Sequence, residues 1–103
     1  MSRPERRIVR VAREAFEELE EVLGTERGPL GEPSLTDFLT IELLAIVDLF
    51  ATRFDDLPTL IEGRSDYRIL IATGTLVHAI SVVAQLAADG SVEILSIDID
   101  LAP

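Results

Sequence analysis

The chain has 103 residues, a length typical of one domain, so we expect a single domain over residues 1–103. Nineteen acidic residues against nine arginines give a net charge of −10, which argues against nucleic-acid binding by the acidic body because phosphate backbones attract basic surfaces. The absence of cysteine excludes disulfides and thiolate metal sites, and because no apolar run reaches the roughly 18 residues of a membrane helix we expect a cytoplasmic protein without membrane contact.

The N-terminal segment allows two interpretations. Ser2 and Glu5 have the spacing of a capping box, with Pro4 at the first helical position, and apolar residues continue at helical spacing to Leu23, which predicts one long helix over 2–23. The β-branched residues of 6–11 favour instead a short strand, with the helix beginning near Ala12. Residues 1–13 carry five arginines and one glutamate, net +4, which leaves −14 on the remainder.

A second helix is predicted from Leu35 to about Phe54. Ser34 is its expected N-cap, with Asp37 three residues further on. The helix is apolar on more than one side, so it is either the central helix of the fold or has a face that binds a partner. The residues of that candidate interface are Ile41, Leu44, Ile46, Val47 and Phe50.

The C-terminal half predicts an antiparallel meander of strands at 67–72, 75–87 and 91–101. Thr73-Gly74 and Asp89-Gly90 are interpreted as two-residue turns between these strands. The resulting register pairs Val82 with Ile97, and it generates one continuous core face without a bulge. The residues predicted on this core face are Tyr67, Ile69, Ile71, Leu76, His78, Ile80, Val82, Ala84, Leu86, Leu95, Ile97, Ile99 and Leu101.

The opposite, open face of the meander holds the candidate site. The register places Arg68, Ala79 and Asp100 in one row and Asp98 opposite Ser81. An ion pair between Arg68 and a carboxylate over the small Ala79 is one interpretation, and a metal or acid–base pair at Asp98 and Asp100 is another. Since no further oxygen ligands cluster there, we expect no metal and no cofactor. Arg64 and Arg68, beside Tyr67, either hold a phosphate or carboxylate or simply belong to a loop entering a strand.

These elements predict an α+β fold, in which two N-terminal helices pack on a C-terminal antiparallel sheet of three or four strands, with a short strand at 6–11 as the open alternative.

The order of elements resembles that of the RelE/ParE toxin superfamily. Residues 8–23, with their Ala- and Glu-rich turn, are similar to the strand and first helix of those toxins. Residues 66–70, Asp-Tyr-Arg-Ile-Leu, are similar to the element that opens the family's meander, and residues 91–98 correspond to its last long strand. The resemblance favours the strand interpretation of 6–11 and implies that the open sheet face forms the functional groove, with Arg68 and Tyr67 as the positions carried over.

The resemblance implies a toxin-type module of a type II toxin–antitoxin system, whose protein partner is an antitoxin. Asp98 and Asp100 lie where the family's ribonucleases keep cations, which argues against RNA cleavage and for action by protein–protein contact. The alternative is a non-catalytic acidic interaction subunit that assembles as a homo-oligomer, a dimer for example. A third interpretation is an enzyme that uses Arg64, Arg68, Asp98 and Asp100.

Overall fold

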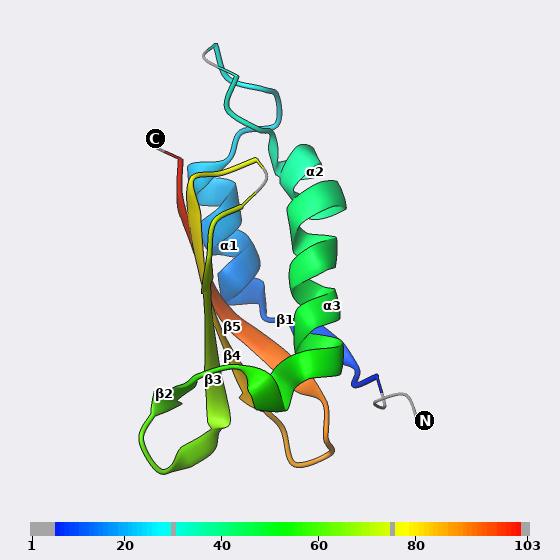
Figure 1. Cartoon of the computed structure of the whole chain (residues 1–103). Coiled ribbons are helices and arrows are strands. Elements are labelled where there is room, and N and C mark those ends of the chain that lie inside the picture. The colour runs from blue at the N-terminus through cyan, green and yellow to red at the C-terminus, as the bar shows by residue number, and fades with distance from the viewer. Residues whose placement is uncertain (1–5, 30, 75, 102–103) are drawn as a thin grey trace, which may run out of the picture.

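A computed structural model describes residues 6–29, 31–74 and 76–101. Five strands form one sheet, and two helical segments lie on one of its faces (Figure 1). The elements in chain order are β1 (Val9–Val11), α1 (Arg13–Val22), α2 (Leu35–Asp37), the π-helical segment η1 (Phe38–Glu42), α3 (Leu43–Arg53), the 3-10 segment η2 (Phe54–Asp56), β2 (Thr59–Ile61), β3 (Arg64–Ala72), β4 (Ala79–Leu86) and β5 (Val92–Asp100). None of the described helices is long and apolar enough to span a membrane.

The sheet is mixed, so the predicted pair of N-terminal helices on a purely antiparallel sheet is wrong. Its strand order is β1-β5-β4-β3-β2, with β1 parallel to β5 and the other neighbours antiparallel. Both helical segments therefore come between the first strand and the rest of the sheet in the chain. A pattern of alternating residues indicates a strand but does not say which partner it pairs with, so five strands and a parallel edge were not foreseen.

Of the two alternatives for residues 6–11, helix or strand, the structure shows a strand, β1, at Val9–Val11. The Val92 N–H donates to the Ile8 carbonyl at 2.8 Å, and the Ala12 N–H donates to the Ile94 carbonyl at 2.9 Å. These bonds to β5 occupy backbone groups that a helix would have used, so α1 begins only at Arg13. The predicted capping box at Ser2, Pro4 and Glu5 lies outside the described residues.

The second helical segment runs from 35 to 53 and begins as predicted. Ser34 Oγ accepts a hydrogen bond from the Asp37 N–H, and an Asp37 carboxylate oxygen accepts one from the Ser34 N–H, both at 3.1 Å. Ser34 is therefore confirmed as the N-cap, in a reciprocal capping box. Arg27 Nε adds a hydrogen bond of 2.9 Å to the same carboxylate, which ties the preceding loop to the start of the helix.

The charge on Asp37 should make stability depend on pH. The hydrogen bond from Arg27, together with that from the Ser34 N–H, lowers the pKa of the Asp37 carboxyl to about 2. The pKa of an unfolded aspartate is about 3.9, so the stabilisation should be complete above that pH and should be lost as the pH falls toward 2. As the pH is lowered from 5 to 2, the thermal unfolding midpoint of Asp37→Asn should fall less than that of the wild type. Parallel curves of midpoint against pH for the two proteins would contradict this.

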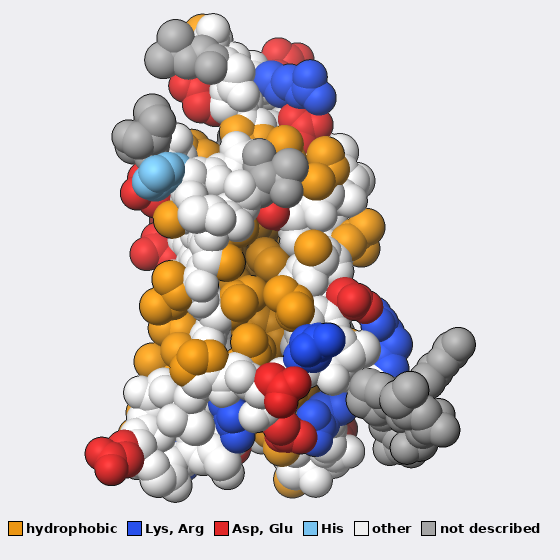
Figure 2. Space-filling model, in the orientation of Figure 1, with side chains coloured by type: hydrophobic (Ala, Val, Ile, Leu, Met, Phe, Trp, Pro, Cys, Tyr) orange, Lys and Arg blue, Asp and Glu red, His pale blue; other side chains and the backbone are white. Residues whose placement is uncertain are grey.

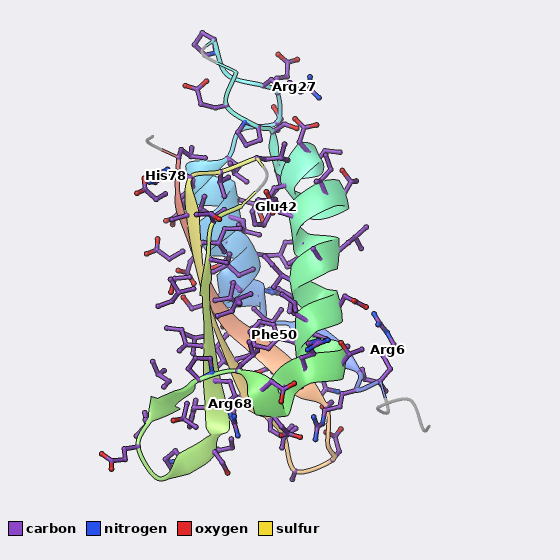
Figure 3. All side chains as sticks on the ribbon, in the orientation of Figure 1. Arg6, Arg27, Glu42, Phe50, Arg68 and His78 are labelled. Atoms are coloured by element: carbon purple, nitrogen blue, oxygen red, sulfur yellow. The ribbon has the colours of Figure 1, made fainter. Side chains whose placement is uncertain are left out.

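The core lies between the helices and the inner face of β4 and β5. Its largest fully buried side chains include Phe38, Phe50 and Leu19 from the helical segments and Val82 and Ile97 from the sheet. The labelled Phe50 points from α3 toward the sheet in Figure 3. These residues make one continuous apolar cluster, as expected when two layers bury their facing sides.

The register of β4 and β5 agrees with the prediction over half its length. Val82 pairs with Ile97 and Ser81 with Asp98 as predicted, but Ala84 pairs with Ile94. The turn holds three residues between Ala87 and Ser91, with Gly90 at φ +87°, so it shifts the register by one. A bulge at Leu95 shifts it back, which hides the error in the outer half of the strands.

The register of β3 and β4 differs from the prediction, and this changes the face of every β3 residue. Ile69 pairs with Val83 and Leu70 with Val82, because β3 ends at Ala72 and β4 begins only at Ala79, so no two-residue turn joins the two strands. Gly74 serves here for close approach, since a Cβ would lie 2.9 Å from the Glu42 carboxylate. Buried Glu42 accepts a hydrogen bond from the Leu76 N–H and so ties this connection to the helix (Figure 3).

Tyr67, Ile69 and Ile71 are therefore on the open face with Gln85, Val83 and Ser81, not in the core, and Ile71 is 73% exposed. His78, predicted at the core face, is an exposed residue of the connection before β4, with its backbone N–H bonded to the Asp100 carbonyl (Figure 3).

Candidate functional site

Arg68 lies on the helix side of the sheet and not in the predicted groove. Its Nη1 donates to the backbone carbonyls of Asp55 at 3.0 Å and Leu57 at 2.7 Å, and its Nε donates to the Ser65 carbonyl at 2.8 Å. Its guanidinium carbon lies 5.4 Å from the centre of the Phe54 ring. Arg68 thus holds the segment that follows η2 against β3, so its role is structural (Figure 3).

The predicted row of Arg68, Ala79 and Asp100 is consequently wrong. Ala79 does pair with Asp100, but Arg68 pairs with Ala84, on the opposite face of the sheet. The structure therefore does not bring together the four residues of the enzyme interpretation.

Arg64 and Tyr67 remain neighbours at the start of β3, but Arg64 already has partners. Its Nε and Nη2 bind the two Asp66 carboxylate oxygens at 3.0 and 2.9 Å, and its guanidinium stacks 4.8 Å from the Tyr67 ring centre. Chiefly because of the hydrogen bond from Arg64, the pKa of the Asp66 carboxyl is lowered to about 2. The Nε and Nη2 donors of Arg64 are thus occupied by a carboxylate of its own strand, so this edge of the guanidinium is not available for a bidentate bond to a phosphate.

Asp98 and Asp100 occupy the open face at the end of β5, as predicted. Both are exposed, and Asp98 lies opposite the partly buried Ser81. Within the described part of the chain no cation lies within ion-pair distance of Asp98, and no group of three potential ligands is placed to hold a metal. These aspartates supply negative charge at one side of the open face.

The predicted helix interface is mostly core. Ile46 and Phe50 are buried and Val47 packs against the core, so these three face inward. Ile41 and Leu44 alone of the five predicted residues are exposed, at 49% and 64%. The high apolar content of this helix is therefore explained largely by its central position in the fold.

The open face carries an apolar row that we call the open-face stripe: Tyr67, Ile69 and Ile71 on β3 and Val83 on β4. The two alternating sets of β3 are Tyr67, Ile69, Ile71 and Arg68, Leu70, Ala72. Because the first set is the more apolar, hydrophobicity alone assigns it to the core, and sequence reasoning missed it as a surface. No signal within β3 would have found it, because the contacts that place Arg68 on the helix side, with the carbonyls at the end of η2, are non-local.

A second apolar surface is the hollow between the sheet and α3 (Figure 2). Leu70 faces this side and remains partly exposed, whereas its β4 neighbour Val82 is fully buried. The helical layer thus covers β4 and β5 better than β3, and β3 shows apolar side chains on both of its faces.

A depression of about 320 Å³ lies where β1 approaches the β4–β5 hairpin, lined by Arg6, Arg7, Ile8, Asp89, Gly90 and Ser91. Its arginines are already paired, Arg6 with Asp48 and Arg7 with Asp55 at 3.5 Å. Asp89, itself part of the lining, would repel an anion, so this depression does not define an anion site.

Comparison of the chain with family models, with curated protein sequences and with solved structures finds no match.

Proposed function

We propose that this chain acts by contact with another protein, as a toxin-type module of a type II toxin–antitoxin pair. The observation that carries the proposal is the open-face stripe, an apolar row across two neighbouring strands in which Ile71 is 73% exposed and Tyr67, Ile69 and Val83 are partly exposed. A contiguous apolar row that remains open to solvent is typical of an interaction site.

The charged groups near the stripe favour binding of a protein partner over catalysis of RNA cleavage. Arg64 is engaged by Asp66, and Arg68 is engaged by three backbone carbonyls on the other face. The Asp98 and Asp100 carboxylates are exposed on the open face, and carboxylates repel the phosphates of RNA. This arrangement favours a protein partner over RNA cleavage.

The second candidate is a non-catalytic acidic subunit that assembles with itself. Its support is the exposure of Ile41 and Leu44, which lie three positions apart on the second helical segment. Residues at that spacing lie on the same side of a helix and can pack together against a second copy.

Inducing the chain alone in a bacterial culture tests the proposal. We expect growth to stop with the wild type and to continue with the double variant Ile69→Gln/Ile71→Gln, which makes the stripe polar. Ile8→Gln is the matched control, because Ile8 is 71% exposed but lies outside the stripe, and it should still stop growth. Unimpaired growth with the wild type would refute the toxin role. If light scattering then showed that the purified chain is a dimer, the second candidate would be selected.

A further inference from the structure

The open face changes in character from one strand to the next. On β3 it presents Tyr67, Ile69 and Ile71, whereas on the middle strand β4 it presents the smaller Ala79, Ser81 and Val83. At the C-terminal end of β5 it presents carboxylates, with Asp100 opposite Ala79 and Asp98 opposite Ser81. Further along β5, Glu93 pairs with Gln85 on β4 and with Arg10 on β1, so the acidic character is confined to the end of the strand. The face is thus apolar on β3 and acidic at the C-terminal end of β5, with the small Ala79 and Ser81 between them.

The dimensions of this surface match one helix. Neighbouring strands lie about 4.8 Å apart, so β3 to β5 spans about 10 Å, which is close to the 10–12 Å diameter of an α-helix with its side chains. Strands β3, β4 and β5 lie side by side over the six residue pairs that join β3 to β4, or about 20 Å, the length of a helix of about 13 residues. The face therefore accommodates a helix that lies along the strands above β4.

The charges on this face indicate the net charge of the helix that would bind there. Asp98 has no ion-pair partner among the residues that the structure describes, and the whole chain carries −10. The chain's own first helix does not suit the surface, because Glu14, Glu17, Glu20 and Glu21 are exposed on α1 and would meet the acidic side of the face. The α1 helix of a second copy is thus disfavoured as the occupant, and a cationic helix is favoured.

We infer that the open face binds a cationic amphipathic helix of the partner protein, with its apolar side over β3 and its Lys or Arg residues over β5. This inference rests on the proposed function and adds the chemistry of the partner. Binding would place helices on both faces of the sheet and bury the open-face stripe, including the 73%-exposed Ile71.

The test uses a fluorescein-labelled, 20-residue synthetic helix of leucine and lysine, compared with its leucine–glutamate counterpart by fluorescence anisotropy against the full chain. We expect the lysine peptide to bind and the glutamate peptide not to bind. Asp98→Asn should weaken binding about threefold and Ile69→Gln/Ile71→Gln about tenfold or more, while Ile8→Gln should leave it unchanged. Amide shifts in the NMR spectrum should map to β3, β4 and β5.

Equal binding by all variants would mean general charge attraction and would overturn the inference. Shifts confined to α3 and to Leu70 would also overturn it, because the peptide would then lie in the hollow on the other face. Growth arrest that depends on Ile69 and Ile71 without any peptide binding would refute the cationic helix and leave the proposed function standing.

Discussion

Replacing Arg68 by alanine should lower the free energy of unfolding by about 2 kcal/mol, because hydrogen bonds from a charged donor are worth about 1.5–3 kcal/mol and some of their carbonyls regain water. The variant loses the bonds to the carbonyls of Asp55, Leu57 and Ser65 and the stacking on Phe54. Urea unfolding followed by circular dichroism measures the difference.

Arg68→Lys is the control for charge. Lysine keeps the cation and the aliphatic stem but lacks the planar fork that serves several carbonyls at once, so it should recover less than half of the lost stability. An exposed arginine on the open face would cost only about 0.5 kcal/mol when removed. A loss that small for Arg68→Ala would contradict the position of Arg68 and restore the register expected from a two-residue turn.

Local signals in the sequence predicted the parts of the fold that depend on local chemistry. Ser34 and Asp37 make a reciprocal cap because the side chain of each accepts a hydrogen bond from the backbone N–H of the other, only three positions away. The predicted pairs Val82–Ile97 and Ser81–Asp98 are correct only because the turn shift and the bulge at Leu95 cancel each other.

The face of β3 was not predictable from its own pattern. Either alternating set of an amphipathic strand can point inward, and the turn decides which. Here the deciding contact is non-local, because Glu42 holds the Leu76 N–H and Gly74 must approach that carboxylate closely. A glycine that indicates a tight turn in the sequence thus has a different role in the structure.

The candidate site was predicted in part for the same reason. Ser81, Asp98 and Asp100 belong to β4 and β5, whose outer register was right, and they lie on the open face. Arg68 was assigned to that face wrongly, and Ile69 and Ile71 were assigned wrongly to the core. Each of these errors follows from the length of one connection.

The most direct test of this account is the matched pair Leu70→Gln and Ile71→Gln, because the proposed partner surface exists only if Ile71 points outward. Leu70 is partly buried against the core and Ile71 is 73% exposed, so Leu70→Gln should lose about 1–2 kcal/mol of unfolding free energy and Ile71→Gln less than about 0.5 kcal/mol. Urea unfolding of both variants beside the wild type measures this. The reverse order, with Ile71→Gln the more damaging, would place Ile71 in the core and would remove the open-face stripe on which the proposed function depends.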